Sequence, residues 1–325
     1  MSDNKGILVI VEVIAGVLSP VAAELLGAAK AIDAGLSGGI SAVAVGIGAK
    51  SAAEALGKLG AAKVFSAETG EATAATVAAI VEKLTGDLKP GVVLMTDNDL
   101  DRDLAPLLAA RLITAAVTDV VALRVDGGKV IVTRPVYGGN ALADFTIETE
   151  PQIISIRPKA FAPAMIDASQ NAEIVELPPT EPSTEVRIIE RIARKEEGPK
   201  IEEAKIVVGG GRGLGGPEGF TQIKSLADLL GGVVGASRPP CDQGWWPEHS
   251  QIGVTGKIIA PDLYVAVGIS GSSQHLSGVS GAKTIVAINK DAEANIFKAA
   301  AYGVTGDWKK VVPALIAKVK DLTGR

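Results

Sequence analysis

The sequence predicts an α/β protein of two domains, each built on a parallel β-sheet. Three observations carry this prediction. The 325 residues exceed what one compact core usually holds. Apolar residues make up 47% of the chain, and short apolar runs alternate with Ala-rich segments that are typical of helices. Only 3% of the residues are aromatic, which suits closely packed layers of helix and sheet.

The N-terminal half reads as strand and helix in turn. Its first run, GILVIVEV at 6–13, is continuously apolar, as expected of a strand covered on both faces. Ser19 and Pro20 then predict a helix that ends near Gly35, with the serine as N-cap and the proline at the first helical position. Further strands are predicted at 40–46, 63–67 and 91–96, and helices near 50–59, 71–85 and 100–113. This alternation predicts a parallel sheet with crossover helices.

A β-rich extension follows the last of these helices. The segment VVALRVDGGKVIVTRPV predicts a hairpin that turns on Asp126-Gly127-Gly128. FTIETE and QIISIRP are expected to extend this β-rich part. The composition then changes at 176–205, which is dense in Pro, Glu, Lys and Arg. This stretch reads as a connector or an exposed strand-like segment between domains.

The C-terminal part predicts a second α/β unit. Its strands are expected at 205–210, 232–238, 251–256, 263–270 and 284–289, with a closing helix from about Trp308. The unusual residues of this unit stand at strand ends rather than on helices. Ligands of open parallel sheets bind at the carboxyl ends of strands, so we expect function in this unit.

Composition excludes several classes of function. The single Cys241 excludes an internal disulfide and a cysteine-based metal cluster, and two histidines make a His-built metal site improbable. A net charge of −5 without a basic stripe argues against a nucleic-acid partner. We expect no transmembrane segment and no signal peptide, and therefore a cytoplasmic protein.

The first candidate site is the glycine-rich turn at 207–220. Gly211, Gly213 and Gly216 satisfy a dinucleotide fingerprint between a strand and a helix that starts near Pro217. An NAD-type domain also needs an acidic residue after the next strand, where this sequence has Ser237 and Arg238. A hydroxyl and a guanidinium suit an anion instead, so a nicotinamide-dependent dehydrogenase is disfavoured.

Two further loops follow predicted strands. In QIGVTGKIIAP, Thr255 either donates a hydrogen bond to a ligand or completes a turn, and no Walker motif is present. In GISGSSQHLSG, hydroxyl, amide and imidazole groups gather around His275. A hydrolase would pair a serine with this histidine, but no G-x-S-x-G elbow exists. Asn289 could hold an adenosine, and Asp307 either does likewise or caps the last helix.

Together these blocks resemble the α subunit of electron-transfer flavoproteins, the FixB family. GGRGLG, GASRPPCDQGW, QIGVTGKIIAPDLYVAVGISGSSQHLSG and TIVAINKDAEANIF agree with that family in order and spacing over roughly 120 residues. The N-terminal half is compatible with the family's first domain. The resemblance implies a Rossmann-like N-terminal domain of the adenine nucleotide alpha hydrolase type over 1–200, with a β-rich extension. It also implies a doubly wound FAD-binding domain over 201–325.

The resemblance further implies FAD as cofactor and a heterodimer with a β subunit, which the N-terminal domain contacts. Such a heterodimer carries electrons from acyl-CoA or related dehydrogenases of fatty acid β-oxidation to a quinone reductase, and is a carrier rather than a stand-alone enzyme. An electron-bifurcating member would instead oxidise NADH with a second FAD in the β subunit and reduce a ferredoxin-type acceptor. Whether the partner holds AMP or FAD stays open.

The family motifs imply a set of cofactor-binding residues. These are Arg212, Gly213, Ser237, Arg238, Gln251, Ile252, Gly253, Val254, Thr255, Gly268, Ser270, Gly271, Ser272, Ser273, Gln274, His275, Asn289 and Asp307. Arg238 would lie over the isoalloxazine, Thr255 near flavin N5 and His275 near the pyrimidine ring. Arg238 and His275 would then stabilise negative charge on the reduced flavin. Val254 departs from a glutamine that is frequent there, which removes a side-chain hydrogen bond.

Overall fold

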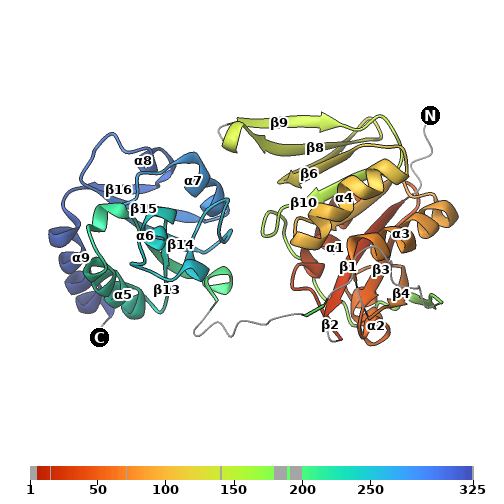
Figure 1. Cartoon of the computed structure of the whole chain (residues 1–325), viewed down its shortest axis with the longest axis horizontal. Coiled ribbons are helices and arrows are strands. Elements are labelled where there is room, and N and C mark those ends of the chain that lie inside the picture. Colours follow the sequence, from red (N-terminus) through yellow and green to blue (C-terminus); the bar gives the residue numbers. More distant parts are fainter. Residues whose placement is uncertain are drawn as a thin grey trace. The chain divides into compact units, whose positions relative to one another are not determined.

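The computed structural model describes residues 6–14, 16–70, 72–139, 141–178, 189–190 and 200–323. The chain divides into two compact units (Figure 1). Unit 1 comprises Met1–Val136 and Leu142–Ile192, and unit 2 comprises Tyr137–Ala141 and Ala193–Arg325. Parallel sheets with helices dominate both units, which confirms the predicted α/β class. Most of the predicted connector, 179–188 and 191–199, lies outside the described residues.

Unit 1 is built on a mainly parallel sheet with the strand order β11-β4-β3-β1-β5-β10-β6. In chain order the strands are β1 (Ile7–Ile14), β2 (Val17–Leu18, antiparallel to β1), β3 (Ile40–Gly46), β4 (Lys63–Glu68), β5 (Val92–Thr96), β6 (Ala116–Val120), β10 (Gln152–Ile156) and β11 (Glu173–Glu176). The four strands predicted before residue 100 are confirmed to within one residue at each end.

Helices cover both faces of this sheet (Figure 1). They are α1 (Ala22–Asp33), α2 (Ala49–Lys58), α3 (Ala74–Leu88) and α4 (Asp99–Arg111). α1 and α2 pack into one core layer with Ile7 and Val9, while α3 and α4 pack into the other with Leu8 and Ile10. Because both faces of β1 are covered, its residues from Ile7 to Val11 are all apolar and buried, and Glu12 is its only charged residue.

The predicted start of the first helix was wrong. α1 begins at Ala22, and Val21 before it provides no side-chain cap. The backbone N–H of Ser19 donates instead to the carbonyl oxygen of Glu12 at 3.1 Å. Ser19 therefore continues the antiparallel pairing of β2 with β1, and it lies three residues before the first residue of α1.

A three-stranded sheet forms the β-rich extension of the first half of the chain. It consists of β7 (Ala122–Asp126), β8 (Lys129–Val136) and β9 (Ala141–Thr146), with a 3-10 turn, η1 (Tyr137–Gly139), after β8. Asp126 pairs with Lys129, and the two glycines between them have φ of 56° and 76°, which confirms the predicted hairpin. QIISIRP does not extend it, because β10 is buried throughout and lies between β5 and β6 in the main sheet.

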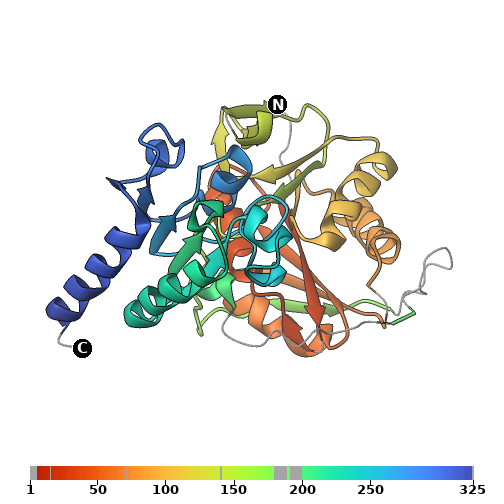
Figure 2. The ribbon, with the colours of Figure 1, turned by 60° about the vertical axis from the view of Figure 1, so that its left-hand side comes forward.

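Unit 2 is a five-stranded parallel sheet with the order β13-β12-β14-β15-β16. Its strands are β12 (Ile206–Gly210), β13 (Val233–Ala236), β14 (Leu263–Val267), β15 (Thr284–Asn289) and β16 (Tyr302–Thr305). Its helices are α5 (Glu218–Leu230), α6 (Arg238–Asp242), α7 (Ser273–Val279), α8 (Ile296–Ala299) and α9 (Trp308–Thr323), with 3-10 turns η2 (Ile201–Glu203), η3 (Arg212–Leu214) and η4 (Glu248–Ser250). α5 and α9 lie side by side in one core layer (Figure 2). The strand order reverses around β12, so the edge between β12 and β14 is a topological switch point.

Two predictions for unit 2 were wrong. The segment 251–256 is not a strand, because after two isolated bridges the chain folds back and Lys257 N–H donates to the carbonyl oxygen of Gln251 at 2.7 Å. The segment around His275 was expected to be a loop, but the loop ends at Ser272 and His275 lies in the helix α7. The predicted positions at which two helices begin, near Pro217 and near Trp308, are confirmed.

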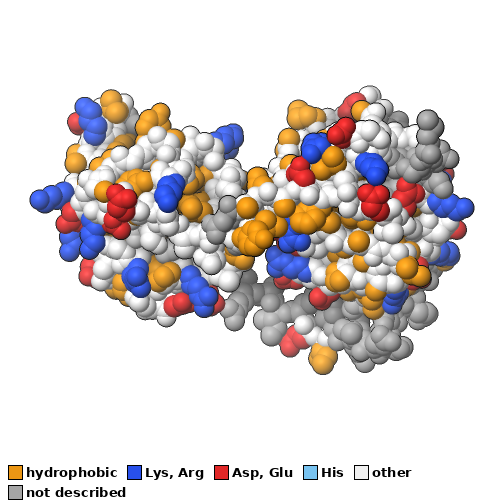
Figure 3. Space-filling view, turned by 90° about the horizontal axis from the view of Figure 1, so that it is seen from above, with side chains coloured by type: hydrophobic (Ala, Val, Ile, Leu, Met, Phe, Trp, Pro, Cys, Tyr) orange, Lys and Arg blue, Asp and Glu red, His pale blue; other side chains and the backbone are white. Residues whose placement is uncertain are grey.

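Charged side chains of both signs are interspersed over the face shown in Figure 3. Within the part of the chain that the structure describes, no helix has the length and apolar character that a membrane crossing requires. The same residues form no group of His, Cys, Asp and Glu side chains that could hold a metal ion.

Candidate functional site

A cavity of about 280 Å³ opens at the carboxyl edge of the sheet of unit 2. Its walls are the segments that follow four strands: Gly213–Gly215 after β12, Gly268 after β14, Ile288–Lys290 at the end of β15 and Gly306–Lys309 after β16. The structure thus brings Gly213, Gly268, Asn289 and Asp307 together, as expected for a ligand site at a switch point.

Glycines let two backbones meet beside this cavity. Gly213 N–H donates to the carbonyl oxygen of Gly268 at 3.0 Å, and a Cβ on Gly211 would lie 2.2 Å from the same oxygen. Gly268 has a φ of 64°, which favours glycine. Arg212 lies exposed in η3, next to this contact. The glycines therefore allow the segments after β12 and β14 to pack backbone against backbone beside the cavity.

Asn289 and Asp307 both have partners within the fold. Asn289 Nδ2 donates to the carbonyl oxygen of Ile269 at 2.8 Å, and its Oδ1 accepts from Asp291 N–H at 3.0 Å. Asp307 Oδ1 accepts from Lys309 N–H at 2.9 Å in the first turn of α9. Asp307 thus caps α9, which was one of the two roles that the sequence suggested for it, and it also lines the cavity.

Ser237 and Arg238 stand where β13 passes into α6. Ser237 is buried, and its N–H donates to the carbonyl oxygen of Gly210 at 3.0 Å. Arg238 is exposed, and its Nε donates to Asp242 Oδ2 at 3.2 Å, one helical turn away. The guanidinium is therefore held at the strand end in a solvated ion pair, which a ligand could replace at little cost.

The loop that follows η4 presents a threonine hydroxyl. Gln251 is buried and its Nε2 donates to the Oγ1 of Thr255 at 2.9 Å and to the carbonyl oxygen of Thr255 at 3.1 Å. Because Oγ1 accepts this bond, the hydroxyl proton stays available for a ligand. Val254 beside it is 55% exposed, so its side chain stabilises no core.

The loop between β14 and α7 presents backbone donors. Among the described residues, the N–H groups of Ser270, Gly271, Ser272, Ser273 and Gln274 donate to no carbonyl oxygen. Gly271 has a φ of 81°, and a Cβ there would lie 2.2 Å from Ile296 N. A run of free N–H groups at a strand end suits a phosphate or another anion.

His275 is buried, with 5% of its surface exposed, and both ring nitrogens have partners. Nδ1 lies 3.2 Å from the carbonyl oxygen of Ile252, and Nε2 lies 2.8 Å from the hydroxyl of Tyr264. Burial lowers the pKa of the imidazole to about 4, so at pH 7 it is neutral. His275 thus brings no positive charge to the site, and its partner is a tyrosine, not the serine that a hydrolase needs. Sequence reasoning missed Tyr264, whose only signal was a phenol in an otherwise apolar strand.

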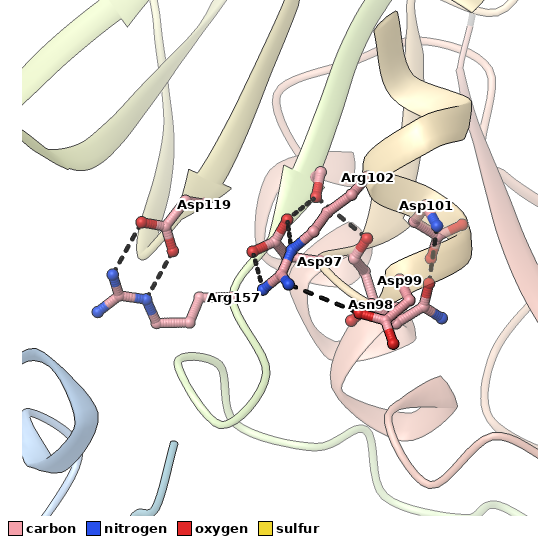
Figure 4. Close-up of polar contacts among 9 residues, drawn as sticks. Asp97, Asn98, Asp99, Asp101, Arg102, Asp119 and Arg157 are labelled. Atoms are coloured by element: carbon pink, nitrogen blue, oxygen red, sulfur yellow. Dashed lines mark hydrogen bonds and ion pairs between the residues drawn. The ribbon is translucent and has the colours of Figure 1, made fainter. Parts of the chain in front are cut away.

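Unit 1 holds a separate polar cluster at the carboxyl ends of β5, β6 and β10 (Figure 4). Arg157 Nε donates to Asp119 Oδ1 at 2.7 Å, and a second bond joins the same two side chains at 2.8 Å. Arg102 pairs with Asp97 at 3.3 Å. Asp101 is buried beside them, and burial, followed by the charges of Glu12 and Asp97, raises its pKa to about 7. This cluster ties the strand ends to α4.

Comparisons with known proteins agree with this architecture. Residues 7–182 match the family model described as "Electron transfer flavoprotein domain", and residues 200–280 match "Electron transfer flavoprotein FAD-binding domain". The electron transfer flavoprotein subunit alpha of Thermoanaerobacterium thermosaccharolyticum is 39% identical, over 99% of this chain and 100% of that protein. The corresponding subunit of Bacillus subtilis is also 39% identical, over 98% of each chain. That of Megasphaera elsdenii is 36% identical, over 100% of this chain and 99% of its own.

The two family models match in the expected order, and the relatives match over nearly the whole length of this chain. The chain belongs to the electron transfer flavoprotein family and is similar throughout to its α subunits.

Proposed function

We propose that this chain binds one FAD along the carboxyl edge of the sheet in unit 2, and that it carries electrons as the α subunit of a heterodimer. The observation that supports this most is the cavity at the switch point. It joins Gly213, Gly268, Asn289 and Asp307 within the part of the fold that contains the FAD-binding family match. A nucleotide is the ligand class that such an edge takes.

The residues present fit the two halves of FAD. The adenosine would occupy the cavity between Asn289 and Asp307, and the pyrophosphate would meet the main-chain N–H groups of the segment 270–274. A side chain at Gly211 would collide with the neighbouring loop, because its Cβ would lie 2.2 Å from the Gly268 oxygen. The glycine at 211 therefore allows the close packing of the two loops beside the cavity.

The flavin ring would lie toward β13, where Arg238 and Thr255 are exposed. When bound, FAD supplies the chemistry of accepting and releasing electrons. Arg238 would supply positive charge to the reduced ring, and the Thr255 hydroxyl would donate a hydrogen bond. Val254 adds no polar contact beside Thr255, which removes one means of adjusting the flavin potential. His275 is neutral and would act on the flavin through its neighbours.

As to partners, we infer a β subunit, a donor among the acyl-CoA or related dehydrogenases, and a quinone reductase as acceptor. The relatives named above are all α subunits, which supports the heterodimer. An electron-bifurcating complex with a second FAD in the β subunit is the alternative. Whether the β subunit would hold AMP or a second FAD stays open.

Co-purification tests the proposal. The chain is expressed with a β subunit, and the flavin released on denaturation is counted per heterodimer. One FAD per heterodimer, reduced by an acyl-CoA dehydrogenase and its substrate, is the expected result. Two flavins, with oxidation of NADH coupled to reduction of ferredoxin, would favour the bifurcating complex. A heterodimer without flavin after incubation with excess FAD would overturn the proposal.

A further inference from the structure

A buried tyrosine reaches the carboxyl edge of the sheet in unit 2. Tyr264 is the second residue of β14 and is 0% exposed. Its phenol passes over the neighbouring strand β12, where a Cβ on Gly209 would lie 2.1 Å from the Tyr264 hydroxyl oxygen. The space for the phenol thus depends on a glycine at 209. A hydroxyl buried this deeply needs a hydrogen-bond partner.

The two hydrogen-bond partners of His275 determine which ring nitrogen carries the proton. The carbonyl oxygen of Ile252 can only accept, so the contact of 3.2 Å requires a proton on Nδ1. In the neutral ring Nε2 then accepts, and the Tyr264 hydroxyl donates to it at 2.8 Å. A single order of donors follows: Tyr264 to His275, and His275 to Ile252.

The Ile252 carbonyl begins a loop that contacts α7 through its backbone. Val254 N–H donates to the carbonyl oxygen of Gln274 at 3.0 Å, and Ile259 N–H donates to that of Gly278 at 2.8 Å. A Cβ on Gly278 would lie 2.5 Å from the backbone of Gly253, so the two segments touch. The imidazole adds a side-chain link at the start of this loop, three residues before Thr255.

We propose that Tyr264 is a positioning residue of the flavin site: its hydroxyl donates to Nε2 of the Nδ1-protonated His275, holds the imidazole in place and thereby holds the loop 252–255 against α7. The inference rests on the proposed function insofar as this loop faces the flavin. Tyr264 itself, 0% exposed, touches no cofactor. It acts through His275 on the backbone that presents Thr255.

Removal of the Tyr264 hydroxyl tests this order. In Tyr264→Phe the buried Nε2 loses its donor, and only the contact of Nδ1 with the Ile252 carbonyl still holds the imidazole. We expect the Val254 amide to exchange its hydrogen faster, and FAD to bind about tenfold more weakly, as the loss of one buried hydrogen bond implies. Tyr302→Phe is the matched control, because Tyr302 lies in the same sheet and is 69% exposed.

Nitrogen NMR of the histidine rings reads the tautomer directly. The chain has only two histidines, and His249→Gln assigns their signals. The full chain carries ¹⁵N-histidine and is studied without flavin and as the FAD-loaded heterodimer with an unlabelled β subunit. In the unsubstituted chain His275 should show a protonated Nδ1 and a hydrogen-bonded, unprotonated Nε2. The Nε2 signal should move in Tyr264→Phe and stay in Tyr302→Phe.

A protonated Nε2 in the unsubstituted chain would overturn the inference without any substitution, even where Tyr264→Phe does not fold. An unchanged Nε2 signal in Tyr264→Phe would overturn it too, as would Val254 exchange and FAD affinity equal to those of Tyr302→Phe. The tautomer is read in the flavin-free chain as well. Absence of FAD binding by the unsubstituted heterodimer therefore contradicts the proposed function and not the hydrogen-bond order.

Discussion

Replacement of Asp101 by asparagine should stabilise unit 1 at pH 8. The carboxyl is buried at the start of α4, and burial, together with the charges of Glu12 and Asp97, raises its pKa from 3.8 to about 7. Below pH 3.8 the group is protonated in both the folded and the unfolded chain, so its ionisation does not lower the free energy of unfolding. As the pH rises toward 7, the unfolded chain releases the proton while the folded chain keeps it, so stability falls. Above pH 7 the cost is constant at roughly 4 kcal/mol.

Asparagine removes this cost, because its amide does not ionise and still fits the space of the carboxyl. The Asp101 N–H keeps its bond of 2.7 Å to Asn98 Oδ1 at the helix start. Amide hydrogen exchange of β5 measures the gain in unit 1 alone, whereas the three tryptophans, at 245, 246 and 308, report only on unit 2. At pH 8 the buried β5 amides of Asp101→Asn should exchange up to about a thousandfold more slowly.

Asp103→Asn is the control, because Asp103 lies on the same helix and is exposed. It should leave the exchange of β5 unchanged. If Asp101→Asn exchanges as fast as Asp103→Asn at pH 8, or faster than the unsubstituted chain, the Asp101 carboxylate is not destabilising and the reasoning fails.

Three further outcomes are expected. Arg238→Ala should lower the reduction potential of the bound flavin by an amount equivalent to about 1 kcal/mol. Asp242→Ala removes the paired carboxylate and should raise the potential. If a redox titration gives equal potentials for both variants, the guanidinium does not have the proposed role. Gly268→Ala should destabilise unit 2 by about 1–3 kcal/mol in thermal unfolding followed by tryptophan fluorescence, because its Cβ would lie 2.9 Å from the backbone at Gly213. Gly231→Ala is the control, because Gly231 has a similar φ of 71° but a Cβ there would have no atom within 4 Å. If this control loses as much stability as Gly268→Ala, the close contact at Gly213 does not cause the loss. Val254→Gln should shift the visible flavin spectrum without changing the unfolding temperature, since Val254 is 55% exposed; an identical spectrum would place the loop away from the ring.

The sequence predicted those parts of the fold that depend on local apolar pattern. Strands such as β1 and β14 are covered on both faces, and their apolar runs, Ile7–Val11 and Leu263–Val267, follow from that burial. Membership of a sheet is a tertiary property, so nothing local assigned β10 to the middle of the main sheet. In 251–256 a short apolar alternation suggested a strand, but Gln251 turns the chain back on itself.

The candidate site was predictable as a set of segments rather than as a set of contacts. The rule that ligands bind at the carboxyl ends of parallel strands identified the segments of Gly213, Gly268, Asn289 and Asp307, which meet at the cavity. The predicted segments of Arg238, Thr255 and His275 do not line it. The hydrogen-bond partners of individual side chains could not be predicted from the sequence in this way. His275 was expected to face a ligand, yet its ring nitrogens bond to Tyr264 and to the backbone of Ile252, both distant in sequence. Asp307 shows that helix capping and a place in the cavity wall are compatible at one residue.

The cavity walls come from the ends of four strands of one sheet, and this links ligand binding to the folding equilibrium of unit 2 alone. The cavity exists only when β12, β14, β15 and β16 are in register, so a nucleotide held there binds the folded sheet and not the unfolded chain. At a free concentration one hundred times its dissociation constant, such a ligand adds about 2.7 kcal/mol to the free energy of unfolding. A nucleotide bound there would therefore raise the stability of one half of the molecule, while the buried carboxyl of Asp101 at the start of α4 makes the stability of the other half depend on pH.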